Sequence, residues 1–452
     1  LFAGGVGSDI TIHPGSLLML TDAVVVGEVT GNLTVNHATV QGRTFTRGTT
    51  RGYFSATAAT LSFTSCLLTG DVTRIWLTST ALTAACGVSG SVWGPSGVHG
   101  GSVSITTALF NSTLADVALV NVAAHVLYLV GGVASAPITI VDNTTGGVSG
   151  GTRCTAAVVR TGGTDVVISG GVLVSHNIAE TGLSGCLLLS NNAVATTLGA
   201  AIVASAKCIR LTRSRLTAAI VVGGNLQSLE LQSESFLSGV TGVRGTIGLV
   251  HVAGSATVNI TGTLVGGDVS ILNIDAGAIL WAGTVFAGTI PHLDVTRVTI
   301  VTTGSVLTGS TTVLALRNCT VIAGETVTTG ALSYIAISEG SVVSCKTVAL
   351  GCTHAFLIDS SSVHSKRLVW ESVTTLTIFK STVNTTVLAD KAYGVEIELS
   401  TVNMDTASLH GSLQFLARNS TISATSACVV MMDGGVVDIR HCALKCGTVS
   451  EG

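Results

Sequence analysis

The chain of 452 residues has little charge, few aromatic side chains and little proline. Charged residues make up 10% of it and aromatic residues 4%, and it contains 4 prolines. Disordered tails, coiled coils and long-helix proteins all need far more charge, so the composition excludes these classes. The formal net charge of -3 also argues against nucleic-acid binding, which usually requires a basic face.

Long apolar runs are missing as well, although 47% of the residues are hydrophobic. A membrane-spanning helix needs roughly 18 or more consecutive apolar residues. The closest run, from Val117 to Ala134, is interrupted by Asn121 and His125, and it alternates in places as a buried strand does. We therefore predict no membrane span in this segment and assign the hydrophobicity to a large internal core.

The cysteine content and the first residue indicate the cellular context. The 11 cysteines favour an oxidising compartment, and the odd number leaves at least one thiol unpaired within this segment. The sequence starts at Leu1 without a visible signal-peptide core. We expect the chain to be a processed or excised part of a longer protein.

What the sequence does contain is an internal repeat. The unit has apolar residues at its first, third and eighth positions and a small residue or cysteine at its sixth, as in Leu314–Val321 and Leu376–Val383. Twelve copies give a mean period of about 21 residues. These copies begin at or near Ile209, Leu229, Val250, Ile271, Leu293, Leu314, Ile335, Phe356, Leu376, Val395, Leu413 and Val437. Less regularly spaced copies begin near Leu33, Leu61, Ile75, Val103, Ile138, Val166 and Leu187.

A period near 21 residues fits two repeat folds, and composition decides between them. Leucine-rich repeats have a suitable length, and Asn318 followed by Cys319 is consistent with one of their types. Their return segments are helical, however, whereas the segments here lack the Glu, Lys, Arg and Leu that helices favour. We therefore predict an all-β parallel β-helix, a β-solenoid with about 21 residues per coil that forms a single elongated rod.

The regularity of the repeat predicts two continuous parts. Residues 187–452 are expected to form regular coils, and residues 1–186 less regular coils with glycine-rich loops such as 87–101 and 146–163. Inward positions of a coil must be apolar or small, and glycine permits corners that other residues cannot form. This architecture accounts for a chain with 54 glycines and so little charge.

Cysteines provide the first candidate site. Cys186 and Cys208 each precede a strand start and lie one coil apart in sequence. Stacked positions are about 4.8 Å apart, which is within the Cα separation of a disulfide. We predict a Cys186–Cys208 disulfide, with two buried thiols as the alternative. Cys66, Cys319 and Cys442 are assigned to the sixth position of the unit.

Metal and nucleophile motifs are weak. Cys428, His441, Cys442 and Cys446 come closest to a zinc site, but no Cys-x-x-Cys pair is present. The segment Gly147–Gly151 matches a nucleophile elbow, yet that motif requires a strand-to-helix turn and no helix is expected. We predict neither a metal nor a cofactor.

Seven Asn-x-Ser/Thr sequons are present, a mild excess over chance. They indicate a secreted glycoprotein, although Asn and Thr are also common at strand ends. The predicted glycosylation sites are Asn32, Asn111, Asn143, Asn259, Asn318, Asn384 and Asn419.

Residues suited to catalysis are sparse. Polysaccharide-cleaving β-helices need paired carboxylates, or a basic residue with acid-bound calcium, on adjacent coils. The acids that we judge isolated are Asp71, Asp116, Asp142, Asp165, Asp275, Asp294 and Asp359. Near Asp359 lie His364, Lys366 and Arg367, the densest polar group, which we interpret as a solvated corner. We predict that the protein is not an enzyme.

The repeat resembles a known protein family. The units Leu314–Val321 and Val437–Leu444 are similar to coils of the right-handed parallel β-helix proteins called pectin-lyase-like. The Thr-, Ser-, Val- and Gly-rich version with cysteines and sequons resembles protist surface proteins, such as the dispersed gene family of kinetoplastids. The likeness covers most of residues 187–452 and includes none of the family's catalytic motifs. It implies an extracellular, glycosylated, adhesive or structural surface protein.

Three functions remain, in order of preference. The first is an extracellular structural β-solenoid, a subunit or segment of a cell-surface filament, hair or coat. It would associate end to end with itself or with neighbouring modules, because no capping helix is visible. The second is an adhesin or a carbohydrate-binding surface protein with glycan partners. The third is a polysaccharide lyase or hydrolase, which would need exposed carboxylates beside Arg or Lys on adjacent coils.

Overall fold

The computed structural model of the protein describes residues 1–94, 96–110, 117–120, 123–124, 127–130, 138–141, 153–155, 157–160, 165–169, 172–175, 177–179, 182–330, 332–408, 414–430 and 436–446. All regular structure in these segments is β-strand, without a helix, so the predicted all-β class is confirmed. The strands pair in parallel, with about 21 residues between stacked strands. The fold is the predicted parallel β-solenoid.

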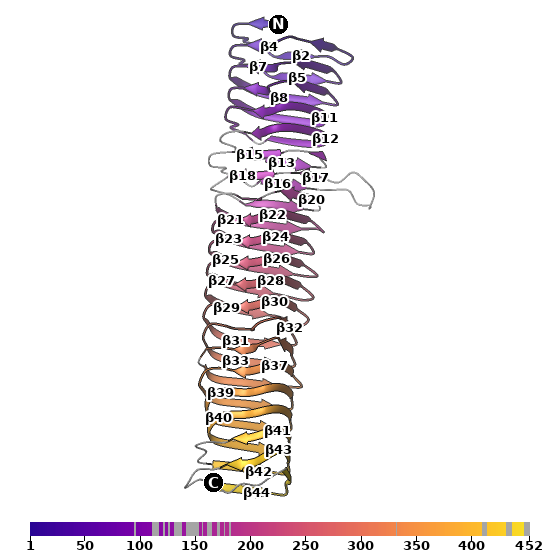
Figure 1. Cartoon of the computed structure of the whole chain (residues 1–452). Helices are drawn as coiled ribbons and strands as arrows, with labels where there is room; N and C mark the ends of the chain where they lie inside the picture. The colour runs from indigo at the N-terminus through magenta and orange to yellow at the C-terminus, as the bar shows by residue number, and fades with distance from the viewer. Residues whose placement is uncertain are drawn as a thin grey trace. The chain divides into compact units, whose positions relative to one another are not determined.

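The chain divides into two compact units, Leu1–Leu226 and Gln227–Gly452, and both are built in the same way. Within each unit the strands stack as successive turns (Figure 1). Each turn contributes strands to three faces, and each face is a column of parallel pairs. The division that the sequence predicts, between less regular coils in residues 1–186 and regular coils in residues 187–452, stays a prediction.

The strands of unit 1 fall into four groups. The first face contains β2 (Ile10–Ile12), β5 (Leu33–Asn36), β8 (Thr50–Thr57), β13 (Val117–Val120), β16 (Ile138–Val141), β19 (Val166–Ser169), β21 (Leu183–Ser190) and β23 (Ala206–Thr212). The second face contains β3 (Leu17–Met19), β6 (Thr39–Gly42), β9 (Thr60–Phe63), β14 (Ala123–Ala124), β17 (Arg153–Thr155) and β20 (Val172–Ser175). The third face contains β1 (Phe2–Ala3), β4 (Ala23–Val26), β7 (Thr44–Arg47), β10 (Cys66–Thr69), β15 (Leu127–Val130) and β18 (Ala157–Arg160). Longer strands that continue from one face to the next are β11 (Val72–Val88), β12 (Ser96–Phe110), β22 (Val194–Ile202) and β24 (Arg215–Val222).

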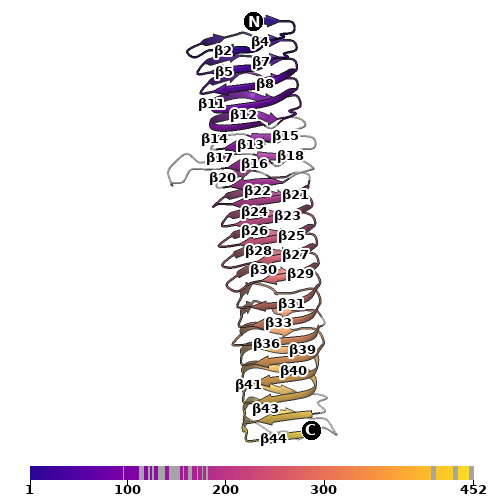
Figure 2. The ribbon, with the colours of Figure 1, turned by 180° about the vertical axis from the view of Figure 1, so that it is seen from behind.

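The strands of unit 2 follow the same scheme, and β25 (Leu226–Gln232) lies at the division. The first face contains β27 (Ile247–Val252), β29 (Val269–Ile274), β31 (Ile290–Thr296), β33 (Thr311–Arg317), β36 (Leu332–Ser338), β38 (Thr353–Asp359), β42 (Gln414–Arg418) and β44 (Val436–Arg440). The second and third faces contain β26 (Phe236–Val243), β28 (Thr257–Val265), β30 (Ile279–Phe286), β32 (Thr299–Thr302), β34 (Thr320–Ala323), β35 (Thr326–Thr328), β37 (Val342–Ala349), β41 (Thr401–Ser408), β43 (Thr421–Val430) and β45 (Ala443–Cys446). Two strands continue through all three faces, β39 (Ser362–Phe379) and β40 (Thr382–Glu398), and Figure 2 shows them from behind on successive turns.

A column of apolar side chains forms the inner side of the first face in unit 2. Leu314 pairs with Ile335, which pairs with Phe356, which in turn pairs with Leu376. All four side chains are at most 1% exposed. Parallel strands with a buried face favour such residues. The repeat starts predicted at these four residues therefore mark inward positions of stacked strands.

Some predicted repeat starts are out of phase. The first-face column passes through Leu272, which pairs with Val250, and the predicted start Ile271 points outward with 56% of its surface exposed. Leu61 and Val103 belong to the second face and not the first, since both pair with Leu82. Apolar alternation has the same period of two on every face. It therefore locates strands without telling one face from another.

A left-handed corner separates the first face from the second. In unit 2 the non-glycine residues with positive φ at this corner include Arg297, Asn318, Ser360, Lys380, Leu399, Asn419 and His441. The residue that follows each corner turns inward, and it is buried at Val298, Cys319, Ser361, Ser381, Ser400 and Ser420. The space there admits only small or compact side chains. This packing explains why the sixth position of the repeat is small or cysteine.

Four of these inward serines, Ser361, Ser381, Ser400 and Ser420, form a serine ladder. The backbone N–H of each donates to the hydroxyl of the next, from Ser361 to Ser381 at 3.1 Å, from Ser381 to Ser400 at 3.1 Å and from Ser400 to Ser420 at 3.2 Å. Each hydroxyl also donates to a backbone oxygen of its own corner, as Ser381 does to Phe379 at 2.6 Å. The ladder thus satisfies polar groups that the corner buries.

We expect Ser381→Ala to lower the free energy of unfolding by about 1–2 kcal/mol, because it leaves the buried N–H of Ser361 without an acceptor. Ser381→Cys is the matched control, and it should lose less. A thiol already occupies the equivalent position at Cys319, where its Sγ contacts the backbone oxygen of Arg317 at 3.2 Å. Urea unfolding followed by circular dichroism measures both. Equal losses in the two variants would contradict a hydrogen-bonding role.

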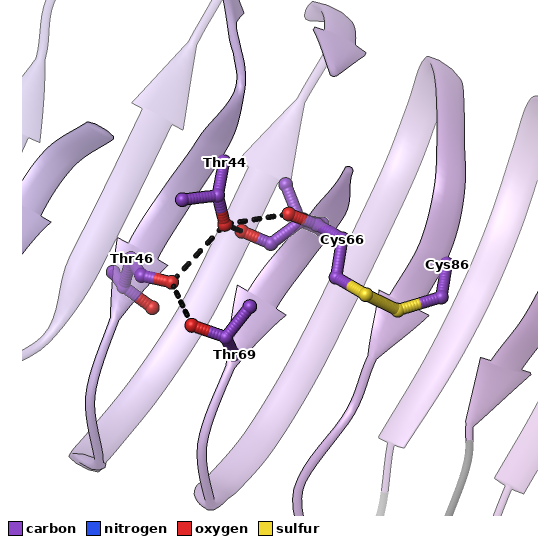
Figure 3. The surroundings of a disulfide bond; sticks show 6 residues. Thr44, Thr46, Cys66, Thr69 and Cys86 are labelled. Atoms are coloured by element: carbon purple, nitrogen blue, oxygen red, sulfur yellow. Dashed lines mark hydrogen bonds between the residues drawn. A yellow bond between two sulfur atoms is a disulfide. The ribbon is translucent and has the colours of Figure 1, made fainter. Parts of the chain in front are cut away.

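Two disulfides join adjacent turns of unit 1. The predicted Cys186–Cys208 bridge is present with a Cα separation of 4.4 Å, because the two residues pair directly across β21 and β23. A second bridge joins Cys66 in β10 to Cys86 in β11, with a Cα separation of 4.3 Å (Figure 3). Placing Cys66 in the same repeat position as Cys319 was wrong. Cys66 lies on the third face, whereas Cys319 follows the left-handed corner.

Threonine hydroxyls occupy the interior beside this second bridge (Figure 3). The hydroxyl of Thr44 donates to the backbone oxygen of Cys66 at 2.6 Å and to that of Thr46 at 3.1 Å. Thr69 donates to the same Thr46 oxygen at 3.1 Å. The buried hydroxyl of Thr44 is therefore satisfied by strand carbonyls of its own turn and of the next turn.

Candidate functional site: a polar groove on unit 2

A groove of about 740 Å³ crosses successive turns of unit 2. Its walls and floor come from β37, β39, β40, β41, β43 and β45, which stack in that order. We call it the polar groove, and its lining residues are Cys345, Lys346, His364, Ser365, Lys366, Asn384, Thr385, Thr386, Asn403, Met404, Asp405, Ser423, Ala424, Thr425 and Lys445.

One column of stacked positions runs the length of this groove. His364 pairs with Asn384, Asn384 with Asn403, Asn403 with Ser423, and Ser423 with Lys445. The Nδ2 atom of Asn403 donates to the Oδ1 atom of Asn384 at 2.8 Å. Parallel strands repeat at about 4.8 Å, so the column presents a polar group at each turn.

The charges of the groove are mainly positive. Lys346 is paired with Glu325 at 2.5 Å, and the hydroxyl of Thr425 donates to Asp405 at 3.0 Å. Lys366 lines the same groove, on β39. The ammonium groups only donate hydrogen bonds, whereas the amides and hydroxyls both donate and accept them. The wall is thus suited to ligands that carry hydroxyl, carbonyl or anionic oxygen.

The floor of the groove is neutral. The hydroxyl of Ser365 donates to that of Thr385 at 3.3 Å, and Thr385 donates to the backbone oxygen of Val387 at 2.9 Å. Burial raises the pKa of the Cys345 thiol to about 12. A thiol that stays protonated near neutral pH is a weak nucleophile. The floor therefore offers surface for binding and no activated nucleophile.

A second hollow in unit 2, of about 530 Å³, is lined by side chains of both charges. Its lining includes His251, Asp275, Asp294, Arg297 and Arg317. His251 Nε2 lies 3.9 Å from an oxygen of Asp275, and a guanidinium nitrogen of Arg317 lies 3.2 Å from an oxygen of Asp294. We call it the charged hollow.

The charged hollow corrects part of the sequence interpretation. Asp275 and Asp294 were judged isolated, but stacking of turns brings a basic side chain to each. Asp165 is not isolated either, since it accepts the backbone N–H of Cys186 at 2.7 Å. The Arg317–Asp294 pair is exposed, and exposed ion pairs contribute roughly 0–1 kcal/mol. These three carboxylates therefore make local surface contacts.

The polar group predicted around Asp359 divides into separate contacts. Asp359 accepts the hydroxyl of Ser360 at 2.8 Å, at the left-handed corner. His364 and Lys366 line the polar groove and not that corner. Arg367 lies over the ring of Trp370, at 3.9 Å from its centroid. The interpretation of all four as one solvated corner was therefore wrong.

The predicted glycosylation sites occupy different settings. Asn111 and Asn143 lie outside the described residues. The described sites are Asn32, Asn259, Asn318, Asn384 and Asn419. Asn318 and Asn419 stand at the left-handed corner with exposed side chains, whereas Asn384 lines the polar groove. Glycosylation itself stays a prediction.

The remaining weak motifs give no site. Among the described residues, no three His, Cys, Asp or Glu side chains gather as a metal site would require. Cys442 follows the left-handed corner at His441, and Cys428 and Cys446 lie on β43 and β45. The segment Gly147–Gly151 lies outside the described residues.

Comparisons with protein-family models, with curated proteins and with solved structures find no match. The resemblance to pectin-lyase-like and kinetoplastid surface proteins stays a prediction. The described segments contain no helix that could span a membrane.

The residues that sequence reasoning missed share one property. Asn403, Ser423 and Lys445 each lie one turn from a groove neighbour, at separations of 19, 20 and 22 residues from Asn384, Asn403 and Ser423. Single residues so far apart carry no local motif. Stepping along the chain by the repeat period comes within two residues of each of them, which narrows the candidates but does not give the register.

Proposed function

We propose that the protein is an extracellular structural β-solenoid, a segment or subunit of a cell-surface filament, hair or coat. The observation that carries the proposal is the pair of inter-turn disulfides, Cys66–Cys86 and Cys186–Cys208. Each joins residues that are directly opposite in neighbouring strands. Disulfides of this kind form and persist in oxidising compartments such as the extracellular space.

The remaining chemistry supports a structural role. The interior consists mainly of apolar side chains, and buried hydroxyls such as that of Thr44 donate to backbone oxygens. The acids of the charged hollow are matched by basic partners. The described cysteine of the polar groove is held protonated by burial, which keeps its pKa far above neutrality. We therefore propose that the protein is not an enzyme.

The experiment is to secrete the full chain, map its disulfides without reduction and image the particles by electron microscopy. We expect both bridges in nearly all molecules, and elongated particles associated end to end. A Cys186→Ser, Cys208→Ser variant is the matched control and should still form particles of the same kind. Compact particles without association, or four reduced thiols in protein isolated from its own source, would overturn the proposal.

A carbohydrate-binding surface protein is the second candidate function, and the polar groove favours it. The groove volume of about 740 Å³ is within the range of small-molecule sites. Its amides, hydroxyls and lysines suit sugar hydroxyls. Glycan-array binding by the native chain, reduced in Lys366→Ala, would support this function. Equal binding by both proteins would count against it.

A further inference from the structure

One sequon lies entirely within the polar groove. Asn384, Thr385 and Thr386, the three residues of that sequon, all line it. The corner sequons differ, because Asn318 and Asn419 have exposed side chains at positions that the groove does not include. A glycan at either corner would extend from the surface, whereas one at Asn384 would start inside a hollow.

We propose that Asn384 carries an N-linked glycan whose first sugars occupy the polar groove, so that this glycan packs against the protein. The inference rests on the proposed extracellular location, since glycosylation needs the secretory route. The occupant of the groove is then the protein's own saccharide and not a free ligand.

Attachment of this glycan has to precede folding of the surrounding turns. Asn384 lies within β40 and pairs on one side with His364 and on the other with Asn403. In the transfer, the amide Nδ2 bonds to the anomeric carbon of an oligosaccharide carried on a lipid pyrophosphate. The bond from that carbon to the pyrophosphate oxygen breaks, the pyrophosphate leaves with the electron pair, and Nδ2 loses one proton. A transferase needs an extended, accessible sequon for this step, which the stacked strand does not offer.

The amide of Asn384 is already held in a suitable orientation. Its Oδ1 accepts from Asn403 Nδ2 at 2.8 Å. The glycosylated amide keeps this oxygen as an acceptor, because only Nδ2 joins the sugar. Nδ2 is the other terminal atom of the same planar amide, so a hydrogen bond to Oδ1 also restricts where Nδ2 lies. The contact therefore limits rotation of the amide to which the sugar is attached.

The lining offers what an N-acetylated sugar requires. Lys366 and Lys445 can donate to hydroxyl and acetamido oxygens, and Asp405 can accept from hydroxyls. Met404 supplies an apolar surface for a sugar ring. A tethered ligand acts at an effective concentration of about a millimolar when the linker is short. Weak individual contacts are thus enough to keep the glycan in place.

The experiment compares glycan release from native protein at different sites. The secreted full chain is treated with a peptide N-glycosidase in heavy-oxygen water, which marks each released site as labelled aspartate, and the peptides are quantified by mass spectrometry. We expect Asn384 to be occupied and to release its glycan roughly tenfold more slowly than Asn419 while the protein is folded. After unfolding, the two rates should become equal.

Two variants separate packing in the groove from simple occupancy. Asn403→Ala removes the contact to Oδ1, so we expect unchanged occupancy and faster release from Asn384. Tyr393→Phe changes an exposed residue of β40 that does not line the groove, and it should behave as the native chain does. Equal release rates at Asn384 and Asn419 in the folded protein would overturn the inference, as would an Asn384 that is bare while Asn419 is glycosylated. In either case the proposed location survives, whereas failure of secretion with reduced thiols would contradict the proposed function itself.

Discussion

Replacing Phe356 by alanine is expected to lower the free energy of unfolding by about 4 kcal/mol. Phe356 is 1% exposed and lies in β38 between Ile335 of the preceding turn and Leu376 of the following one. The substitution removes apolar contacts on both sides and leaves a cavity. The backbone of each neighbouring turn is fixed by hydrogen bonds above and below, so these turns cannot collapse into the space.

The matched control for Phe356→Ala is Ile322→Ala on the outward side of β34. Ile322 is 48% exposed, and its truncation should cost less than about 1 kcal/mol. Urea unfolding followed by circular dichroism gives the midpoints of both variants. Solenoids can unfold in stages, so the transition of the native chain is recorded first. Similar losses for the two variants would mean that Phe356 does not act as a stacked core residue.

Much of this column could be predicted from the sequence. Leu314, Ile335, Phe356 and Leu376 recur at intervals of 20 or 21 residues, and the structure stacks them. A spacing fixed by one complete turn survives in the sequence, because every turn must place an apolar side chain at the same inward point. Leu61 was predicted as a repeat start but lies on the second face, because inward apolar residues alternate identically on each face.

The groove was much harder to predict. His364 and Lys366 were noticed as polar, but nothing local connects them with Asn403 or Lys445. The turn length varies, from 19 residues between Asn384 and Asn403 to 22 between Ser423 and Lys445. A shift of one residue moves a side chain from the outside of a strand to the inside. Contacts across turns therefore need the true register, which the mean period does not contain.

The Cys66–Cys86 bridge illustrates the opposite case, in which the information was present. Its two cysteines are 20 residues apart, and those of the predicted Cys186–Cys208 bridge are 22 apart. The argument from one stacked turn applies equally to both pairs. It was not applied to Cys66, because that residue had been placed at the corner position of the repeat.

The second large loss of stability is expected for Gly309→Ala, because Gly309 belongs to a stack of glycines in unit 2. Gly267, Gly288, Gly309 and Gly330 follow each other at successive turns of unit 2, with backbone atoms in close approach. A Cβ atom on Gly309 would lie 2.0 Å from the backbone oxygen of Gly288. Backbone atoms cannot rotate away as a side chain can, so the two turns must separate locally. We expect a loss of about 3 kcal/mol in the free energy of unfolding.

Gly394→Ala tests whether that loss comes from the close approach or from glycine replacement in general. In β40, the nearest atom to a Cβ on Gly394 is the backbone oxygen of Thr374 at 3.6 Å, an ordinary contact. This variant should remain within about 0.5 kcal/mol of the native chain, because alanine also restricts the unfolded state. Thermal and urea unfolding of the two variants side by side provide the measurement. A Gly309→Ala protein as stable as Gly394→Ala would show that the turns can separate at little cost, and that the glycine stack does not set their spacing.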